Sequence, residues 1–221
     1  MKANEWFGRR RAVAIVLTAI LLTGFGLEAS AFSVGDGVTK DYSFATEDGK
    51  YLFVMLVPDQ EESVAAEDRE LDPKMREIYE RSGLYLNDGS TSPLWTVDWY
   101  AAEVYVSSDG LHLVRVGLWP TYESDKDFEK NGRALGQLAL AFYQGGKKVR
   151  DYDISQLIQK PGKLPRGRSH FQWRERIWLD ESAHRLNVIT HDEQKLVFDL
   201  LTGKVVERRL PEEPAPLPKR S

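Results

Sequence analysis

The feature that most constrains this fold is a repeated pattern of short apolar runs joined in pairs by tight turns. The turns contain Asp-Gly at 48–49 and 109–110, Gly-Gly at 145–146 and Thr-Gly at 202–203. Such pairs between apolar runs are typical of β-hairpins, because glycine supplies the positive φ that tight turns need. The chain is therefore expected to fold mainly into antiparallel strands.

The hairpins group into three similar units. Each unit has one hairpin followed by a second, and the units cover roughly residues 42–100, 103–155 and 171–210. The sequence thus predicts an all-β fold of three tandem four-stranded antiparallel units, with short helical insertions between strands.

Three hairpin segments resemble parts of β-propeller blades. Lys195 to Val206 resembles the outer hairpin of a blade. Glu47 to Phe53 and Ser108 to Leu113 resemble the inner Ser-Pro-Asp-Gly hairpin, although the first lacks Ser-Pro and the second lacks Pro. The resemblance implies a partial propeller of radially packed sheets. It implies no activity, because propellers serve both as binding scaffolds and as enzymes.

The units differ in their insertions. In the first, at 58–82, Asp72-Pro73 indicates a capped helix that ends at Gly83. In the second, at 118–133, Ser124 begins a capping box for a short helical turn. The apolar run 134–142 fits the start of either a helix or a strand, and the repeat favours a strand. A Pro/Gly-rich linker at 159–170 precedes the third unit.

Three units are fewer than the roughly four to eight blades of a closed ring, so an open arc with two end faces is expected. The runs 52–56 and 138–142 are apolar at consecutive positions, which predicts cover on both faces of their sheets. Either the inserted segments cover the end faces, or a second copy of the chain does.

The first 31 residues have the three parts of a secretory signal peptide in order. Lys2 and Arg9 to Arg11 form a basic start, residues 12–27 are 16 uncharged and mostly apolar residues, and Ala29-Ser30-Ala31 is a small-residue cleavage site. The alternative is a retained membrane anchor, but the run is shorter than the roughly 20 residues that span a bilayer. A twin-arginine signal at Arg9-Arg10 lacks support from the flanking residues.

Composition limits the compartment and the partners. The whole chain has 30 basic and 34 acidic residues; residues 1–31 hold four and two of them, so 26 and 32 remain, a net charge of −6. This balance argues against nucleic acid as a partner, because phosphate binding needs a basic surface. The absence of cysteine excludes disulfides and thiolate sites. We expect an exported protein, periplasmic or secreted, that leaves the membrane after cleavage.

The expected domain organisation is a signal peptide at 1–31, one β-rich domain at 32–210, and a proline-rich disordered tail at 211–221. The four histidines have no metal-ligand spacing, and no calcium loop, nucleophile elbow or cofactor motif is found. We therefore expect no metal and no cofactor.

Two sets of residues are candidates for function. Trp95, Trp99, Tyr100 and Trp119 form a binding surface in one interpretation and part of the core between sheets in the other. Asp98, Glu103, Asp180 and His170 would support a hydrolase only if they met in one pocket.

The sequence favours an exported binding or scaffold module of the cell envelope, with a protein or small-molecule ligand outside the cytoplasm. The alternatives are an envelope hydrolase that uses the loop carboxylates, and a membrane-anchored subunit if the signal is retained. Self-association into a homodimer is the alternative to capping by the insertions.

We predict cleavage between Ala31 and Phe32, because the small side chains of Ala29 and Ala31 fit the narrow subsites of a signal peptidase. N-terminal sequencing of the exported protein tests this. A mature chain that still begins at Met1 would show a retained anchor instead.

Overall fold

The computed structural model describes residues 39–58, 69–129 and 132–210. All described residues belong to one compact unit. The signal peptide with its cleavage residues Ala29 and Ala31, and the proline-rich tail 211–221, lie outside the described residues and stay predictions. Within the described ranges, no helix is long and apolar enough to cross a membrane.

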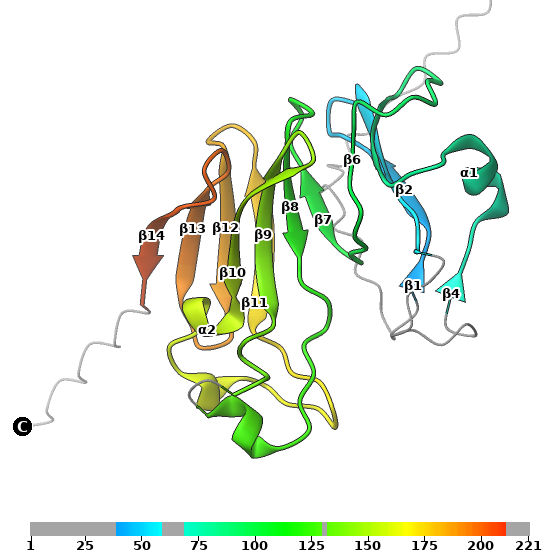
Figure 1. The fold of residues 1–221 in the computed structure, drawn as a ribbon. Helices are drawn as coiled ribbons and strands as arrows, with labels where there is room; N and C mark the ends of the chain where they lie inside the picture. The colour runs from blue at the N-terminus through cyan, green and yellow to red at the C-terminus, as the bar shows by residue number, and fades with distance from the viewer. Residues whose placement is uncertain (1–38, 59–68, 130–131, 211–221) are drawn as a thin grey trace, which may run out of the picture. The chain divides into compact units, whose positions relative to one another are not determined.

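The predicted architecture is confirmed: the chain forms three four-stranded antiparallel sheets (Figure 1). The first sheet contains β2 (Tyr42–Ala45), β3 (Tyr51–Met55), β5 (Gly83–Leu86) and β6 (Trp95–Thr96). The second contains β7 (Val104–Val106), β8 (His112–Val116), β9 (Leu138–Gln144) and β10 (Lys147–Asp153). The third contains β11 (Arg174–Asp180), β12 (Arg185–Thr190), β13 (Lys195–Asp199) and β14 (Val205–Arg209).

Neighbouring strands within each of these three sheets follow one another along the chain. This is the strand order that the hairpin repeat predicts. No sheet within the described ranges closes or curls into a propeller, and each of the three ends in strands that have a partner on one side only. The resemblance to propeller blades is therefore confirmed only as three four-stranded antiparallel sheets.

A small hydrogen-bonded turn recurs in all three sheets. The side-chain hydroxyls of Thr46, Ser107 and Thr190 each donate to the aspartate two residues later, over 2.7 Å between Thr46 Oγ1 and Asp48 Oδ1. Each hydroxyl also accepts the backbone N–H that enters the next strand. The hydroxyl thus links the aspartate of the turn to the start of the next strand.

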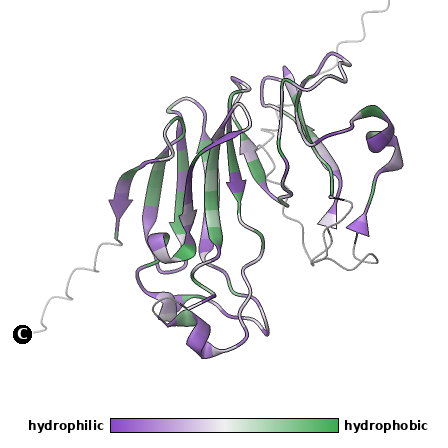
Figure 2. Cartoon of the chain, viewed as in Figure 1, coloured by the Kyte–Doolittle hydropathy of each residue, from purple (hydrophilic) through white to green (hydrophobic). Residues whose placement is uncertain are grey.

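The second sheet shares a core with each of the other two. Phe53, Met55 and Leu84 of the first sheet are buried in one cluster with Val106 and Leu113 of the second. A separate cluster joins the opposite face of the second sheet to the third; it includes Val114, Leu140, Phe142, Leu186 and Phe198. Hydrophobic residues accordingly run along the strands of the second and third sheets in Figure 2. The sequence prediction for 138–142, a strand covered on both faces, is confirmed, whereas residues 134–137 form a turn and not the start of this strand.

The same contact joins consecutive sheets twice. Trp95 Nε1, from the last strand of the first sheet, donates to the carbonyl of Gly110 in the β7–β8 turn of the second over 2.8 Å. Tyr152 Oη, from the last strand of the second sheet, donates to the carbonyl of Gly203 in the β13–β14 turn of the third over 2.8 Å. Both glycines have positive φ, and a Cβ on either would lie within 3.0 Å of an aromatic ring. Only glycine fits both the conformation and the approach.

The face of the third sheet that points away from the second sheet is covered by charged side chains. Arg176 lies 4.8 Å from the ring centroid of Trp178, and Arg185 pairs with Asp199. Val197, which pairs with Asn187 across β12 and β13 on this face, is only 8% exposed. Long charged side chains can cover apolar atoms while their charged ends stay in water. This end face therefore needs no inserted segment to cover it.

The first insertion differs from its sequence prediction. Helix α1 spans Pro73–Ile78, and Asp72 accepts from the backbone N–H groups of Lys74 and Met75 as its N-cap. The helix ends before Tyr79, which is extended, and not at Gly83, which is the first residue of β5. A Cβ at Gly83 would lie 2.2 Å from the Trp95 carbonyl oxygen, so this glycine serves strand pairing and not the helix end.

An ion pair between the partly exposed Arg76 of α1 and the buried Asp41, which directly precedes β2, holds α1 beside the first sheet. Arg76 binds both carboxylate oxygens of Asp41, at 2.7 and 2.9 Å, and the backbone N–H of Val57 donates to the same carboxylate. Burial alone would raise the pKa of Asp41, but these hydrogen bonds outweigh it and lower the pKa. A two-stranded parallel sheet, which the repeat did not predict, joins β1 (Thr39–Lys40), directly before Asp41, to β4 (Arg69–Glu70), which precedes α1.

The second insertion contributes to a core and does not cover an end face. Its 3-10 turn, Asp125–Phe128, has the predicted capping box at Ser124. The ring of Phe128 packs 4.8 Å from that of Phe171, within the cluster between the second and third sheets. The segment expected to be a linker is held against the third sheet. Its residues Gln159 and Lys160 lie between the short helices α2 (Ile154–Leu157) and Pro161–Lys163, and their backbone N–H groups donate to the carboxylate of Asp192.

We predict that Gly203→Val lowers the free energy of unfolding by about 3 kcal/mol, because it adds both an unfavourable φ and a clash with Phe142. Gly49→Val is the matched control: Gly49 has φ of 69°, but nothing lies within 4 Å of its added Cβ, so we expect a loss of about 1 kcal/mol. Urea melts measure both. Equal midpoints for the two variants would contradict the close approach of the sheets at Gly203.

Candidate functional site

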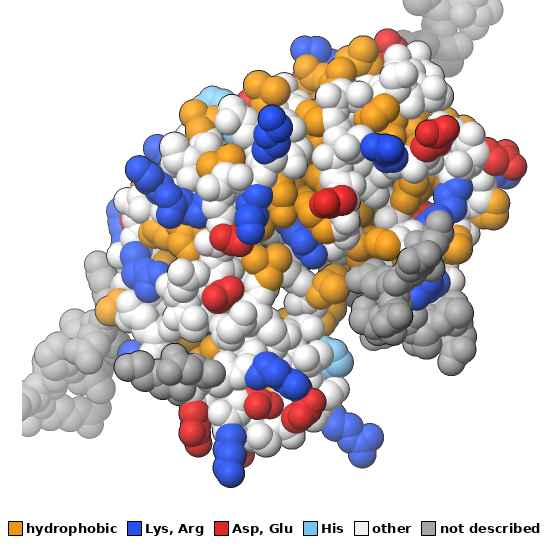
Figure 3. All heavy atoms as spheres, viewed as in Figure 1, with side chains coloured by type: hydrophobic (Ala, Val, Ile, Leu, Met, Phe, Trp, Pro, Cys, Tyr) orange, Lys and Arg blue, Asp and Glu red, His pale blue; other side chains and the backbone are white. Residues whose placement is uncertain are grey.

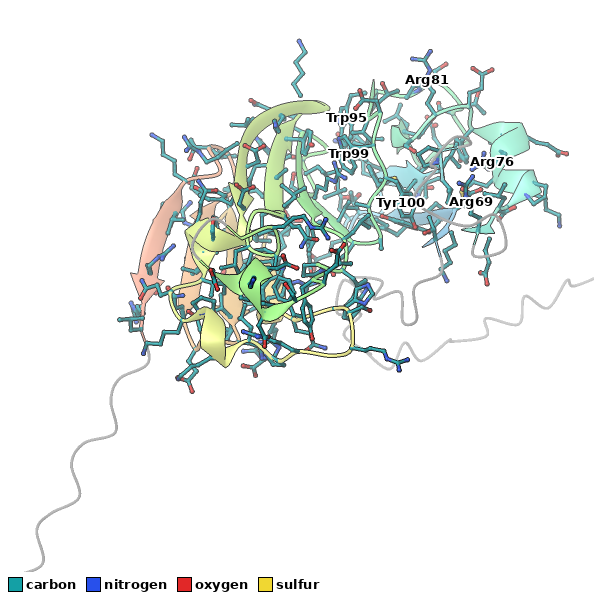
Figure 4. The ribbon with its side chains drawn as sticks, turned by 60° about the horizontal axis from the view of Figure 1, so that its bottom comes forward. Arg69, Arg76, Arg81, Trp95, Trp99 and Tyr100 are labelled. Carbon is teal, nitrogen blue, oxygen red and sulfur yellow. The ribbon has the colours of Figure 1, made fainter. Side chains whose placement is uncertain are left out.

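Three of the four predicted aromatic residues lie together between the first and second sheets (Figure 4). The ring of Trp95 is 6.1 Å from that of Phe53, and the ring of Trp99 is 5.0 Å from that of Tyr143. Tyr100 is 4% exposed, and its hydroxyl lies 3.1 Å from both the backbone N and O of Lys40. Their positions match the second interpretation of this cluster, core between two sheets.

Trp119 lies apart from those three residues. It is 46% exposed, as is its neighbour Leu118, and both line a groove with a volume of about 360 Å³. We call this the edge groove, because its walls include residues of β7 and β11, the first strands of the second and third sheets. Its lining residues come from three segments of the chain: Ala102, Glu103 and Tyr105; residues 117–120; and residues 171–177.

An ion pair lies within the edge groove. Arg174 binds one carboxylate oxygen of Glu103, and Tyr105 Oη lies 2.9 Å from the other. The Tyr105 hydroxyl is also 3.2 Å from the carbonyl oxygen of Ile177, so it connects the two walls. Burial, together with the nearby charge of Glu103, raises the pKa of Tyr105 well above its usual range. Tyr105 therefore stays protonated and can donate a hydrogen bond at any physiological pH.

The polar residues that the hydrolase alternative needs are not brought together. Glu103 lies in the edge groove, whereas Asp98 lines a separate shallow pocket with Arg81 and Gly146. The carboxylate of Asp180 accepts from Ser182 and the backbone of Ala183, which lowers its pKa, and His170 is exposed beside Ser169. The convergence on which that alternative depended is absent from this set of residues. Within the described ranges, no three His, Asp or Glu side chains gather as metal ligands.

Sequence reasoning identified two residues of the edge groove, Trp119 and Glu103, but under different hypotheses. It missed Arg174 and Tyr105. The spacing of Glu103 and Tyr105 places both on one side of a strand, which is a weak local signal. Arg174 is 71 residues from Glu103 in the sequence, and only the packing of the second and third sheets brings them together.

Comparison with models of known protein families gives no match for this sequence, and comparison with curated proteins gives none either. The site must therefore be interpreted from its own geometry.

We predict that Arg174→Met lowers the free energy of unfolding by about 2 kcal/mol, because it leaves the mostly buried carboxylate of Glu103 without a cation. The double variant Glu103→Gln with Arg174→Met removes the charge as well and should recover at least half of that loss. Urea denaturation measures both. If the double variant is as unstable as Arg174→Met, the unpaired charge of Glu103 is not the cause of the lost stability, and the prediction is wrong.

Proposed function

We propose that this protein is an exported binding or scaffold module of the cell envelope, and that the edge groove is where it contacts its ligand. The observation that carries the proposal is the exposed pair Leu118 and Trp119 beside a hydrogen-bonded floor of Glu103, Arg174 and Tyr105. Large exposed aromatic side chains next to fixed polar groups are the usual composition of a recognition site.

Two further observations support a ligand of the expected kind, a protein or a small molecule outside the cytoplasm. On the face shown in Figure 3, Lys and Arg side chains are interspersed with Asp and Glu and form no continuous basic surface. A nucleic acid would need such a surface. The chain begins with a basic segment, an apolar run and a small-residue site, which supports export.

We further propose that the three sheets follow the plan of propeller blades as an open arc. The consecutive strand order in each sheet supports this, because blades are built in that way. In such an arc, β7 and β11 are the innermost strands, and the edge groove lies between them. This arrangement, like the resemblance to propeller blades, does not indicate an activity.

Capture from the envelope fraction of the source organism tests the binding proposal. The mature chain from residue 32 is immobilised, and we expect Trp119→Ser to reduce the retained ligand by about tenfold or more, since exposed aromatic anchors dominate recognition. Leu94→Ser is the matched control: Leu94 is 51% exposed but lies outside the groove.

Loss of retention with Trp119→Ser and not with Leu94→Ser supports the groove as the site. Equal retention by all three proteins, or equal loss in both variants, would contradict it.

A further inference from the structure

The edge groove has an unusual wall, made of main chain and not only of side chains. Arg174, Glu175, Arg176 and Ile177 all line it, and they are consecutive residues of β11. Side chains in a regular strand alternate between the two faces, and the one register irregularity of β11 lies between Arg174 and Arg176. The adjacent residues Arg176 and Ile177, which follow it, can therefore line one groove only where the strand presents its edge. The groove therefore runs along the backbone of β11.

This edge of β11 has no strand beside it in the described part of the chain, since β11 is the end strand of its sheet. The carbonyl of Ile177 points away from β12 and into the groove, because it lies 3.2 Å from Tyr105 Oη on the opposite wall. In an antiparallel ladder, the N–H and C=O groups of one residue point the same way, and every second residue repeats this direction. Ile177 and Leu179 thus direct their main-chain groups to the open edge.

The charges of the groove favour one kind of ligand. Glu103 is neutralised by Arg174, and Arg176 is held over the ring of Trp178, 4.8 Å from its centroid. Glu175 is exposed and has no ion-pair partner among the residues that the structure describes. Arg176 keeps its positive charge over the ring, whereas Glu175 is an exposed carboxylate on the strand edge and complements a basic side chain directly opposite it on an added strand.

We propose that the edge groove binds an extended peptide segment of a partner protein, which adds to β11 as a fifth strand. Main-chain hydrogen bonds to the N–H of Ile177 and to both groups of Leu179 hold it, while the Ile177 carbonyl keeps its contact with Tyr105. A basic side chain faces Glu175, and an apolar side chain contacts Leu118 and Trp119. Addition of a strand to an open sheet edge is a general mode of peptide recognition. This inference rests on the proposed function, because it names the ligand class of the same groove.

Two N-acetylated, C-amidated heptapeptides test this inference. In both, Thr and Leu alternate on either side of the central residue, which is Lys in one peptide and Glu in the other. Titration against the mature protein, followed by tryptophan fluorescence, should show the Lys peptide binding about fivefold more tightly, as expected for an opposite-charge pair across strands. In Glu175→Lys the preference should reverse, whereas Glu175→Gln should abolish it. The side chain of Glu175 is exposed, so both variants should fold.

Amide hydrogen exchange separates strand addition from contact through side chains alone. With the Lys peptide at ten times its Kd, exchange of the Ile177 and Leu179 amides should slow by about tenfold. The amide of Leu94, outside the groove, is the internal control and should not change.

Binding without protection of the β11 amides, or without reversal in Glu175→Lys, would overturn the inference. If the envelope ligand depends on Trp119 but neither peptide binds, the groove remains the proposed binding site and the extended-peptide ligand is wrong. If the peptides bind and protect β11 while Trp119→Ser still retains the envelope ligand, strand addition is supported and the proposed function fails separately.

Discussion

The structure depends on one contact made twice, an aromatic donor of one sheet bound to the carbonyl of a turn glycine in the next. Trp95 makes it to Gly110, and Tyr152 makes it to Gly203. The contact combines a hydrogen bond with close packing, because each turn lies against an aromatic ring where only a glycine has room. It fixes the distance and the offset between consecutive sheets, and buried apolar clusters then fill the space between them.

The edge groove is a consequence of this stacking. When consecutive sheets pack face to face, their first strands lie near each other, and neither β7 nor β11 has a further strand on its outer side within the described ranges. Tyr105 and the pair of Glu103 with Arg174 connect these two edges. The result is a polar floor, an open strand edge and an exposed aromatic rim in one place, which is why we propose this groove as the recognition site.

Much of the fold could be predicted from local signals. Turns such as 48–49 and 202–203 specify hairpins because the conformation of each is set by two or three adjacent residues. The parallel pairing of β1 with β4, the role of Gly83 and the pairing of Arg174 with Glu103 could not be predicted, because each depends on residues distant in sequence. The aromatic cluster at 95–100 shows the same limit: its composition fits a binding surface or a core, and only the neighbouring sheet decides which.

The central claim is that the two glycine-turn contacts join the three sheets into one cooperative unit. Native-state hydrogen exchange of the mature protein, measured at increasing urea concentration, tests it most directly. The account predicts that the slowest amides of β3, β8 and β12 converge on one free energy of opening, equal to that of global unfolding. It would be contradicted if the slowest amides of one sheet opened at a distinctly lower free energy, independent of the other two.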